Sequence, residues 1–440
     1  MNILIKFKKT VIPNRKEQEQ LKKIADFSIN LVKKEATKYS EVNTIEFAGS
    51  YAKGTWLPKS QDIDIFVKFH ENTNPEKFES IGKKIGFDSL KKFKPYVRYS
   101  EHPYVEAFVK GKRVNVVPCY DVKSGNWKSA ADRSPFHTKF ILNSLDQSHK
   151  NEVRMLKKFL IDNDLYGAEI AKQAFSGYVA EVLILYYGSF LKVIKAAANF
   201  RWNQIIGKAT KKFDTPLVII DPIDSNRNLG TAVSIENIGR LVLLSRAFLK
   251  KPSLFFKPKK PSKKNLENTL VLTFGYKKRS PDVIWGQLKR SASALTKQLN
   301  LAGFNVLRSQ VVTDEISNAA LIFLLQSIKI EKRMVRKGPD FFRSKDSDKF
   351  ISKNNKKSIV MWIGDGGRIL SLQNRLENDA VGFLRNILKN KIKTSGVSNG
   401  LLPDFKKGFK IQYGKQVKNK FIKKAIQALA STDEYTFYSS

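Results

Sequence analysis

The sequence predicts a multidomain protein of the α+β class. Its 440 residues are too many for one ordinary hydrophobic core, and a hydrophobic content of 42% is ample for several packed domains. Helical and strand-like hydrophobic patterns alternate along the chain. A stretch at 250–264, with seven lysines, three prolines and no acid, marks a domain boundary. We therefore expect a head over residues 1–142, a helical neck over 143–250, and a basic body and tail over 251–440.

The head begins with a predicted helix and continues as strands. Asn14 and Glu17 have the spacing of a capping box at the start of the helix. The segments "NTIEFA" and "DIDIFV" predict two strands joined through a Gly-Ser turn, and residues 102–120 predict a hairpin with Gly111 and Lys112 at its turn. The expected apolar face of the helix consists of Leu21, Ile24, Phe27, Leu31 and Val32.

Five further elements are predicted, two in the last part of the neck and three beyond it. Residues 216–230 predict a buried strand that ends in a polar loop, and a helix capped by Ser234 follows. Beyond the boundary, residues 269–276 have a strand-like pattern and residues 283–303 a helical one. The apolar run at 319–330 fits either a buried strand or a buried helix.

Membrane and secreted proteins are both disfavoured by the sequence. The most apolar long run, "FSGYVAEVLILYYGSFLKVI" from Phe175, contains Glu181 and Lys192 and predicts a buried helix rather than a membrane span. The segment "MNILIKFKKT" lacks the apolar core of a signal peptide. Cys119 is the only cysteine, which excludes an intramolecular disulfide and fits a reducing, cytoplasmic location.

The charge of the chain indicates a polyanionic partner. The chain has 80 lysines and arginines and 40 acidic residues, which gives a net charge of +40. The segment 389–424 alone holds eleven lysines and one acid. An excess spread along the chain favours nucleic acid over a membrane surface. A lysine-rich proteome would also raise the isoelectric point, but here the basic excess accompanies a motif suited to phosphate.

That motif is a pair of aspartates after a Gly-Ser turn. Asp62 and Asp64 lie one residue apart on a predicted strand, so their carboxylates project from the same face. Hard carboxylate oxygens at this spacing suit Mg²⁺, which usually takes one or two carboxylates plus substrate phosphates. Two such ions ~4 Å apart would activate a hydroxyl and neutralise a leaving pyrophosphate. The alternative is a pair of surface carboxylates on an edge strand.

The stretch "GSYAKGTWLPKSQDIDIFV", residues 49–67, resembles the signature of the polymerase-β nucleotidyltransferase superfamily. More narrowly, it is similar to that of the archaeal (class I) CCA-adding enzymes, which complete the 3′ end of tRNA. Further blocks match in the family's order: "EHPYVEAFVKGKRVNVVPCY", "ADRSPFHTKFI", "NEVRMLKKFLIDNDLYGAE", "FSGYVAEVLILYYGSF", "DPIDSNRNLGTAVSIENI" and, less sharply, "EKRMVRKGPDF". The resemblance implies a polymerase-β-like nucleotidyltransferase head, a helical neck, and α+β body and tail domains. The C-terminal quarter matches only in length and basicity.

The resemblance assigns the nucleotide and metal contacts of the head. Gly49 and Ser50 would bind the nucleotide triphosphate, and Asp62 and Asp64 would hold Mg²⁺. The first of these two positions is often Glu in the family. Lys53 stands where the family usually has Arg, so its phosphate contact becomes a point charge instead of a bidentate fork.

The resemblance also assigns four residues to the nucleotide pocket and the tRNA 3′ end. His137, Lys157 and Tyr166 would line the pocket, and Arg227 would serve nucleotide and 3′-end recognition. Taken alone, His137 fits a capping or core histidine, Tyr166 a packing aromatic, and Arg227 a solvated loop residue. Their assignment depends on the blocks that surround them.

One position departs from the family pattern. The family's third carboxylate lies in Val-Asp-Val-Val-Pro-Cys-Tyr, whereas this chain has "VNVVPCY" with Asn115 in place of the aspartate. An amide has no negative charge and cannot accept a proton from the attacking hydroxyl, so we expect a weakened catalytic site. An exchange introduced to trap a substrate complex and a natural chain that tolerates the loss both fit the sequence.

The resemblance implies template-independent addition of C, C and A to the 3′ end of tRNA from CTP and ATP, with Mg²⁺ as cofactor and pyrophosphate released. The basic body and tail would hold the tRNA, since A-form RNA is met mainly through phosphates and 2′-hydroxyls. Two alternatives remain: a poly(A)- or oligoadenylate-type transferase, and an RNA-binding protein with a decayed catalytic site. Whether the chain forms a homodimer, as some family members do, is left open.

Overall fold

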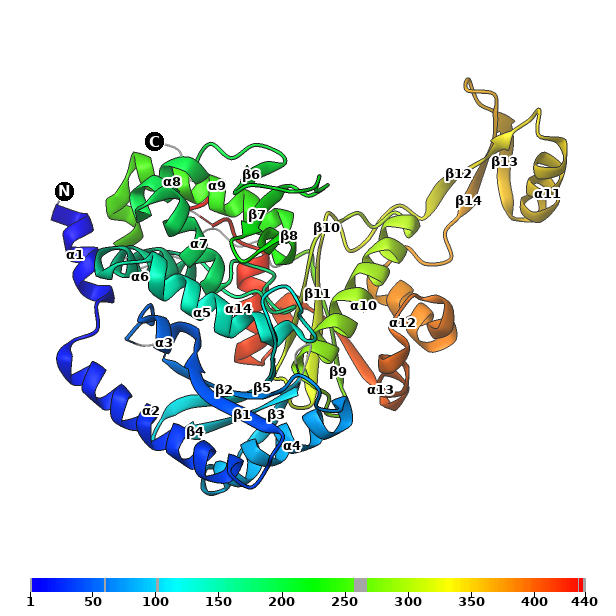
Figure 1. The fold of residues 1–440 in the computed structure, drawn as a ribbon. Coiled ribbons are helices and arrows are strands. Elements are labelled where there is room, and N and C mark those ends of the chain that lie inside the picture. Colours follow the sequence, from blue (N-terminus) through cyan, green and yellow to red (C-terminus); the bar gives the residue numbers. More distant parts are fainter. Residues whose placement is uncertain (1, 59–60, 100–102, 257–266, 434, 438–440) are drawn as a thin grey trace. The chain divides into compact units, whose positions relative to one another are not determined.

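The computed structural model describes residues 2–58, 61–99, 103–256, 267–433 and 435–437. The chain forms two compact units, each of which mixes helices and strands as expected (Figure 1). The first unit consists of Met1–Lys260, Ser280–Asp282 and Asp433–Ser440, and the second of Pro261–Arg279 and Val283–Thr432. The finer division of the chain into head, neck, body and tail stays a prediction.

A five-stranded sheet forms the N-terminal part of the first unit. Its strand order is β1-β2-β5-β4-β3, with β2 and β5 parallel and the other neighbours antiparallel. The strands are β1 (Val42–Ala48), β2 (Asp62–His70), β3 (Tyr96–Tyr99), β4 (Pro103–Val109) and β5 (Lys112–Asp121).

Two helices, α2 (Arg15–Ala36) and α4 (Pro75–Ser89), cover one face of this sheet (Figure 1). Ile63, Ile65 and Val67 are fully buried on that face and form one core with the two helices. Because side chains alternate along a strand, Asp62 and Asp64 point to the opposite face. Burial of the apolar side chains of β2 thus fixes the direction in which the two aspartates point.

The predicted start of α2 is confirmed, and its predicted buried face is partly wrong. The Asn14 side chain accepts from the backbone N–H of Glu17, and the Glu17 carboxylate accepts from that of Asn14, which completes the capping box. Phe27, however, is 38% exposed and lies edge-on to Phe93. The buried stripe is instead Leu21, Ala25, Ser28, Ile29, Val32 and Ala36, because small residues let the helix lie closer to the sheet.

Two predicted turns have a different form. The Gly-Ser turn is a short helix, α3 (Gly49–Lys53), which begins directly after β1. The hairpin between β4 and β5 turns at Lys110 and Gly111 rather than at Gly111 and Lys112. Lys110 and Gly111 both have positive φ angles, which a two-residue hairpin of this kind requires.

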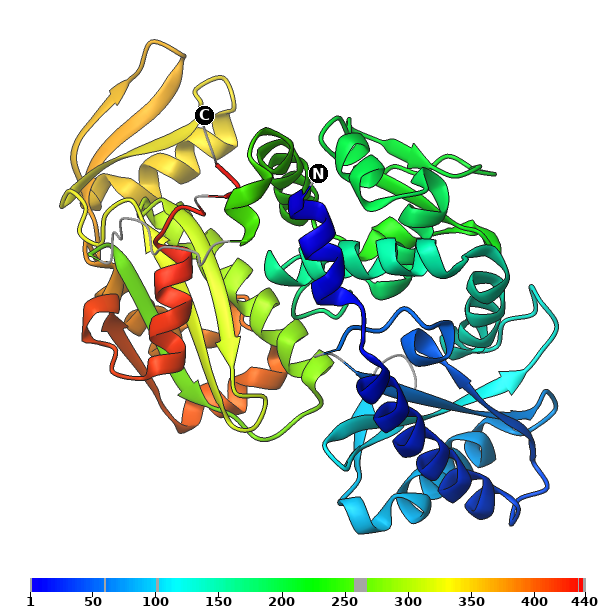
Figure 2. The same cartoon turned by 90° about the vertical axis from the view of Figure 1, so that its left-hand side faces the viewer.

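The rest of the first unit is mainly helical. Helix α1 packs against α6 (Figure 2). Phe7 of α1 lies in the core that α6 to α9 form. The single buried helix predicted from Phe175 is two helices, α7 and α8, bent by 94° after the left-handed Gly188. The helices are α1 (Asn2–Val11), α5 (Arg133–Ser144), α6 (Gln147–Asp162), α7 (Gly177–Tyr187), α8 (Phe190–Ala197) and α9 (Ile235–Lys250).

Among the described residues, no single helix is long and apolar enough to cross a membrane, and only the bent pair α7 and α8 passes a test of combined length and composition.

Ser234 caps α9 as predicted, since its hydroxyl accepts from the backbone N–H of Asn237.

The polar loop predicted at the end of residues 216–230 is itself a strand. The polar segment pairs back onto the buried strand in a three-stranded sheet of order β6-β7-β8. Its strands are β6 (Gln204–Ile206), β7 (Leu217–Asp221) and β8 (Asp224–Asn228). Of the predicted connector, residues 257–264 lie outside the described residues, and Pro252–Phe256 form a 3₁₀ turn whose Leu254 and Phe255 pack on the helical core.

The second unit contains a four-stranded sheet of order β10-β11-β9-β15. Helices α10 and α12 pack on one face of it and α14 on the other. The apolar run at 319–330, which fitted a strand or a helix, supplies the buried strand β11. These elements are β9 (Thr269–Gly275), α10 (Pro281–Ala302), β10 (Val306–Thr313), β11 (Asn318–Leu325), α12 (Ala380–Asn390), α13 (Leu402–Lys407), β15 (Phe409–Tyr413) and α14 (Lys420–Leu429).

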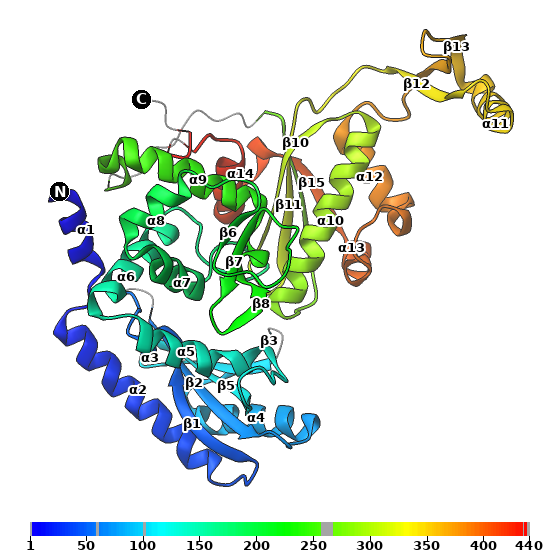
Figure 3. The ribbon, with the colours of Figure 1, turned by 45° about the horizontal axis from the view of Figure 1, so that its top comes forward.

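A small module projects from the four-stranded sheet within the second unit (Figure 3). Its three-stranded sheet has the order β12-β14-β13, and α11 packs against it. The module consists of β12 (Arg333–Asp340), α11 (Ser344–Asn354), β13 (Ser358–Ile363) and β14 (Arg368–Asn374).

Candidate active site

The open face of the five-stranded sheet brings Asp64 against the start of α3. A Cβ atom placed on Gly49 would lie 1.9 Å from Asp64 Oδ2, and Gly49 has a φ of +66°. Glycine fits here for two reasons. It has no Cβ atom to clash with Asp64, and it adopts a positive φ without steric penalty. Gly49, which is 15 residues before Asp64 in the sequence, therefore lies directly against its carboxylate, and Ser50 is the next residue of α3.

Asn115 lies beside Asp64 on the neighbouring parallel strand. The two residues are register partners, and Asn115 Nδ2 donates to Asp64 Oδ1 over 2.8 Å. The other amide atom, Asn115 Oδ1, is buried and has no hydrogen-bond partner among the described residues. A buried carbonyl oxygen without a partner is costly, and it indicates that a donor or a cation belongs there.

Arg113, which the sequence motifs did not single out, lies next to Asp62. The two residues are also register partners, and Arg113 Nε is 3.6 Å from Asp62 Oδ1. Asp62, Asp64 and the free oxygen of Asn115 form a set of oxygen donors on one face, which fits the preference of Mg²⁺ for oxygen ligands. The described residues contain no group of three or more Asp, Glu, His or Cys side chains in metal-binding arrangement. The donor set is thus that of a two-carboxylate site.

Burial acts on both carboxylates. It raises the pKa of Asp64 to about 6, although the hydrogen bond from Asn115 opposes the shift, and Asp62 adds to it. Burial likewise raises the pKa of Asp62, opposed by the charge of Arg113. A raised carboxylate pKa means that the negative charge lacks a full counter-charge, and a bound cation would supply it.

A second group of charges lies where α3 meets the helical part of the unit. Glu181 of α7 accepts from Lys53 Nζ at 2.5 Å and from Lys157 Nζ at 2.9 Å, and Thr55 also donates to it. Burial would raise the pKa of Glu181, but the two lysines outweigh burial and lower it to about 2. Because two ammonium groups share one carboxylate, one positive charge is left over, and burial lowers the pKa of Lys53. The surplus positive charge is the complement of a phosphate.

A third group surrounds Asp221 at the end of β7. Its carboxylate contacts His137 Nε2 at 2.9 Å, Arg227 Nη1 at 3.2 Å and the Tyr178 hydroxyl at 3.0 Å. The His137 ring also stacks on the Tyr178 ring, with centroids 3.8 Å apart. Burial lowers the pKa of His137, and Asp221 opposes the shift. Asp221 therefore holds the predicted histidine and arginine together.

Tyr166 lies beside Lys157, and both border Gly177. A Cβ atom on Gly177 would lie 2.7 Å from the Tyr166 hydroxyl and 3.5 Å from Lys157 Nζ. Burial raises the pKa of Tyr166 well above its usual range, so the hydroxyl stays neutral. Lys53 Nζ lies 5.4 Å from the Tyr178 ring, which links the lysine pair to the third group.

Sequence reasoning missed the residues that hold the predicted ones in place. Glu181 and Asp221 are fully buried and bind four of the ten predicted residues between them, but both lay in segments assigned to the core. The available signal was an acid inside the apolar run of α7 and another at the end of "LVIID". A charge in such surroundings needs a partner, which is a prediction that composition alone allows.

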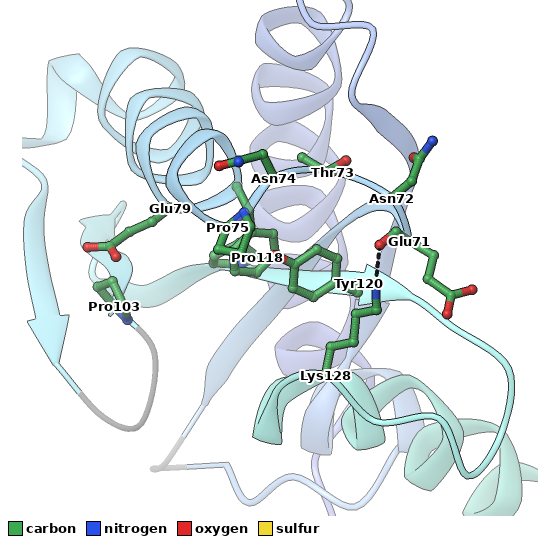
Figure 4. Close-up of a pocket in the computed structure, with 11 residues that line it drawn as sticks. Glu71, Asn72, Thr73, Asn74, Pro75, Glu79, Pro103, Pro118, Tyr120 and Lys128 are labelled. Atoms are coloured by element: carbon green, nitrogen blue, oxygen red, sulfur yellow. Dashed lines mark hydrogen bonds between the residues drawn. The ribbon is translucent and has the colours of Figure 1, made fainter.

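A hollow of about 430 Å³ beside the five-stranded sheet contains none of the predicted site residues (Figure 4). It lies where β2 and β5 end, and Lys128 donates across it to the backbone oxygen of Glu71. Glu71 is the residue after the end of β2 and seven residues beyond Asp64, which places the hollow about 20 Å from the aspartate pair. We assign it no part in the candidate site.

Three protein-family models match successive parts of the chain. A nucleotidyltransferase domain matches residues 29–145, the second domain of tRNA nucleotidyltransferase residues 151–257, and the C-terminal domain of CCA-adding enzymes residues 267–414. The five-stranded sheet with its aspartate pair falls in the first match, and Glu181 and Asp221 fall in the second.

Relatives from archaea match nearly the whole chain. A protein of Pyrobaculum islandicum named CCA-adding enzyme is 34% identical over 86% of this chain and 91% of its own length. One of Saccharolobus shibatae with the same name is 34% identical over 88% and 92%. Among solved structures, E. coli MS115-1 CdnC with ATP aligns with a TM-score of 0.44 and 16% identity, over 59% of this chain and 93% of that chain. A similarity of that level supports no functional conclusion.

Proposed function

The chain belongs to the archaeal CCA-adding enzymes, and from that premise we propose how its own residues carry out the reaction. It is a tRNA nucleotidyltransferase that adds CCA to the 3′ end of tRNA. Nothing in the comparisons favours a poly(A)-type transferase. The observation that supports our proposal is the aspartate pair on the open sheet face, close to a lysine pair with one surplus positive charge.

The proposed reaction is an in-line displacement at phosphorus. The 3′-hydroxyl oxygen of the tRNA forms a bond to the α-phosphorus of CTP, and the bond from that phosphorus to the bridging oxygen of the β-phosphate breaks. Pyrophosphate leaves with the bonding electron pair, and the hydroxyl proton passes to a base or to water. The step occurs twice with CTP and once with ATP.

Asp62 and Asp64 would hold Mg²⁺ on the open sheet face. When bound, Mg²⁺ neutralises charge on the triphosphate and lowers the pKa of the attacking hydroxyl. Asp64 is the better anchor, since the hydrogen bond from Asn115 and the close approach of Gly49 fix its carboxylate. Ser50, the second residue of α3, would contact the triphosphate.

Lys53 and Lys157 would neutralise the triphosphate from the other side. The predicted direct phosphate contact of Lys53 needs refinement, because its ammonium group is buried and already bonded to Glu181. We propose that the pair acts as a fixed positive field rather than as a mobile grip. His137 and Arg227, held by Asp221, would contact the nucleotide and the tRNA 3′ end.

Asn115 supplies a carbonyl oxygen where the family has a third carboxylate. Loss of one charge next to the attacking hydroxyl weakens the stabilisation of the transition state, which costs ~10²–10³ in rate when such a group is removed. We therefore propose slow nucleotide addition and expect Asn115→Asp to raise the rate.

The test is incorporation of labelled nucleotides into tRNA that lacks its CCA end, with Mg²⁺ present. We expect two C and one A to be added and no incorporation of UMP or GMP. Asn115→Asp should raise the single-turnover rate, with tRNA affinity unchanged. Fast turnover by the unchanged chain, with no gain from Asn115→Asp, would show that position 115 is not the third ligand.

The proposed tRNA surface is testable separately, through the second unit. Exposed lysines gather on the projecting module, and they include Lys345, Lys349, Lys353, Lys356 and Lys357. Each phosphate that such a surface neutralises releases counterions, so tRNA affinity should fall steeply with salt. Equal affinity at about 50 and 200 mM salt would exclude this surface as an RNA contact.

A further inference from the structure

The chain around β6 carries a cluster of cations that no motif includes. Residues 201–213, which we call the basic loop, contain Arg201, Lys208, Lys211 and Lys212 and no acid. All four cationic residues are exposed. Such a run fits either a solvated surface or a contact for a polyanion. The shape of the loop and its aromatic neighbours favour the polyanion.

Hydrogen bonds hold the basic loop in one shape. Asn203 has a positive φ of +57°, and its Nδ2 donates to the backbone oxygens of Phe213 at 2.7 Å and Thr215 at 3.1 Å. The Thr210 hydroxyl donates to the backbone oxygen of Ser225 over 3.0 Å. The loop is therefore closed at its base and tied to β8. A surface fixed in this way loses little conformational entropy when a partner binds.

Aromatic side chains lie among the cations of the basic loop. Trp202 is 68% exposed, and Tyr186 at the end of α7 is 49% exposed. A Cβ atom on Gly207 would lie 3.4 Å from the Tyr186 hydroxyl, which places this tyrosine beside the loop. Lys211 Nζ lies 5.3 Å from the centre of the Phe213 ring. Proteins that bind single-stranded nucleic acid combine these two features, because bases stack on the rings and phosphates bind the cations.

The basic loop also lies next to the residues predicted to recognise the tRNA 3′ end. Thr210 is bonded to Ser225, which lies two residues before Arg227 on β8, or about 6–7 Å along the strand. Tyr186 lies five residues after Glu181 on α7, or about 7–8 Å along the helix. A nucleic-acid strand that leaves Arg227 along β8 would therefore pass beside the loop.

The aromatic side chains distinguish an unpaired strand from a duplex. Bases within an A-form stem are stacked on each other, so protein rings reach only the bases of loops and free ends. An acceptor stem would use the cations and leave the exposed rings without a function. The 3′ end of a tRNA continues as an unpaired strand beyond this stem, and it uses both.

We propose that the basic loop and Tyr186 bind the unpaired 3′ strand of the tRNA next to its growing end. Trp202 would stack on a base, and Lys211 and Lys212 would bind phosphates. The contact gains nucleotides as the 3′ end grows, so the loop holds a longer end more tightly. The inference rests on the proposed function, because the bound strand is the substrate of that reaction.

The first experiment measures binding without the reaction. Three forms of one tRNA, with no, one or three unpaired 3′ nucleotides, are titrated with the full chain in Mg²⁺ without CTP or ATP, and fluorescence anisotropy gives Kd. Trp202→Ala should weaken binding of the longest form about tenfold, since it removes one stacked base. It should weaken binding of the blunt form less than twofold, which also shows that the variant folds. Trp202→Phe keeps a ring and should bind the longest form within about threefold of the unchanged chain.

Equal losses of affinity for the three forms would place Trp202 against the stem or in the fold and overturn the proposal. Loss for none of them would overturn it as well.

The second experiment tests the phosphate contacts through salt. Each phosphate contact to a single strand adds about 0.7 to the slope of log affinity against log salt. The double variant Lys211→Ala/Lys212→Ala should therefore lower the slope for the longest form by about 1.4. Lys22→Ala/Lys23→Ala is the matched control, because it removes two consecutive exposed lysines of α2, and it should leave the slope unchanged. An unchanged slope in the first variant would overturn the proposal.

Single-turnover addition of AMP to the longest form separates the basic loop from the catalytic machinery. The loop touches no reacting atom, so Trp202→Ala should raise the tRNA concentration needed for half-maximal rate and keep the rate at saturation within twofold. A chain that adds no nucleotide but shows the length-dependent loss of affinity would refute the proposed function and support binding by the loop. A chain that adds nucleotides but loses affinity equally for all forms would refute the loop alone.

Discussion

Asp64 and Glu181 belong to the same unit, and desolvation acts to raise the pKa of both, yet their pKa values move in opposite directions. Burial raises the pKa of Asp64 to about 6, and the hydrogen bond from Asn115 opposes the shift. Glu181 has two ammonium groups and a hydroxyl within 3 Å, and its pKa falls to about 2. The number of cationic partners, rather than the depth of burial, separates the two.

The difference assigns them different tasks. Glu181 has all its partners in the folded chain, so it fixes Lys53 and Lys157 and needs no ligand. Asp64 has no ion pair among the described residues, and the more distant charges of Lys53 and Arg113 do not offset its burial. An incompletely neutralised acid is typical of binding sites, where proteins lose stability for the sake of function. Substitutions at Asp64 should therefore reduce catalysis, and substitutions at Glu181 should reduce the stability of the fold.

The largest expected effect is on catalysis at Asp64. Asp64→Asn removes the charge that would anchor Mg²⁺ but keeps the shape, so CMP addition should fall by about 10³ or more. Binding of tRNA, measured by filter retention, should stay within twofold. A parallel loss of tRNA binding would mean that the aspartate pair is structural.

The next largest effect is on stability at Glu181. Glu181→Gln leaves two buried lysines without their shared anion, and removing one partner of a buried ion pair costs about 3–5 kcal/mol. The free energy of unfolding is measured in urea at pH 7. Glu236→Gln, an exposed acid in the first turn of α9, is the control and should cost less than about 1 kcal/mol. Similar values for the two variants would refute the structural role of Glu181.

A smaller effect is expected from Gly49→Ala. The new methyl group would lie 1.9 Å from Asp64 Oδ2, so the carboxylate must move and nucleotide addition should slow at least tenfold. Gly111→Ala is a matched control, because Gly111 also has a positive φ but has no atom within 4 Å of the added Cβ. Both variants should lose about 1 kcal/mol from backbone strain. Only Gly49→Ala should lose nucleotide addition. Equal rates of addition by the two variants would show that Gly49 is not part of the active site.

The smallest effect has the opposite sign. Between pH 3.8 and about 6 the folded chain binds more protons at Asp64 than the unfolded chain does, so this group makes stability fall as pH rises. In EDTA, Asp64→Asn should therefore be more stable than the unchanged chain by about 1 kcal/mol at pH 7.5, a gain that vanishes near pH 4. Urea unfolding at both pH values measures it. A variant less stable at pH 7.5 would contradict the uncompensated charge.

Local patterns predicted the acidic strand and its surroundings well. Period-two alternation in "DIDIFV" was enough to place Asp62 and Asp64 on one face, and the capping box at Asn14 was visible as a pair of residues three apart. The resemblance to known sequences then located Asn115 beside them, which the strand register confirms.

Long-range partners could not be predicted from local patterns. Glu181 and Lys53 are 128 residues apart, and nothing in either segment identifies the other. Phe27 was assigned to a core from its spacing alone, but the helix turns small residues toward the sheet instead. Glu106, the register partner of Asn115 on β4, was not singled out either, because the sequence does not show which acids share a row across strands.

A row of register partners crosses all five strands of the sheet and limits where insertions and deletions can be tolerated. Ala48, Asp64, Asn115, Glu106 and Tyr96 are successive register partners across all five strands. Because the side-chain period is two, a one-residue deletion in β5 before Asn115 would bring a valine into the row and turn the asparagine toward the core. Length changes in the head should therefore accumulate in the connections between strands, even where those connections carry no chemistry.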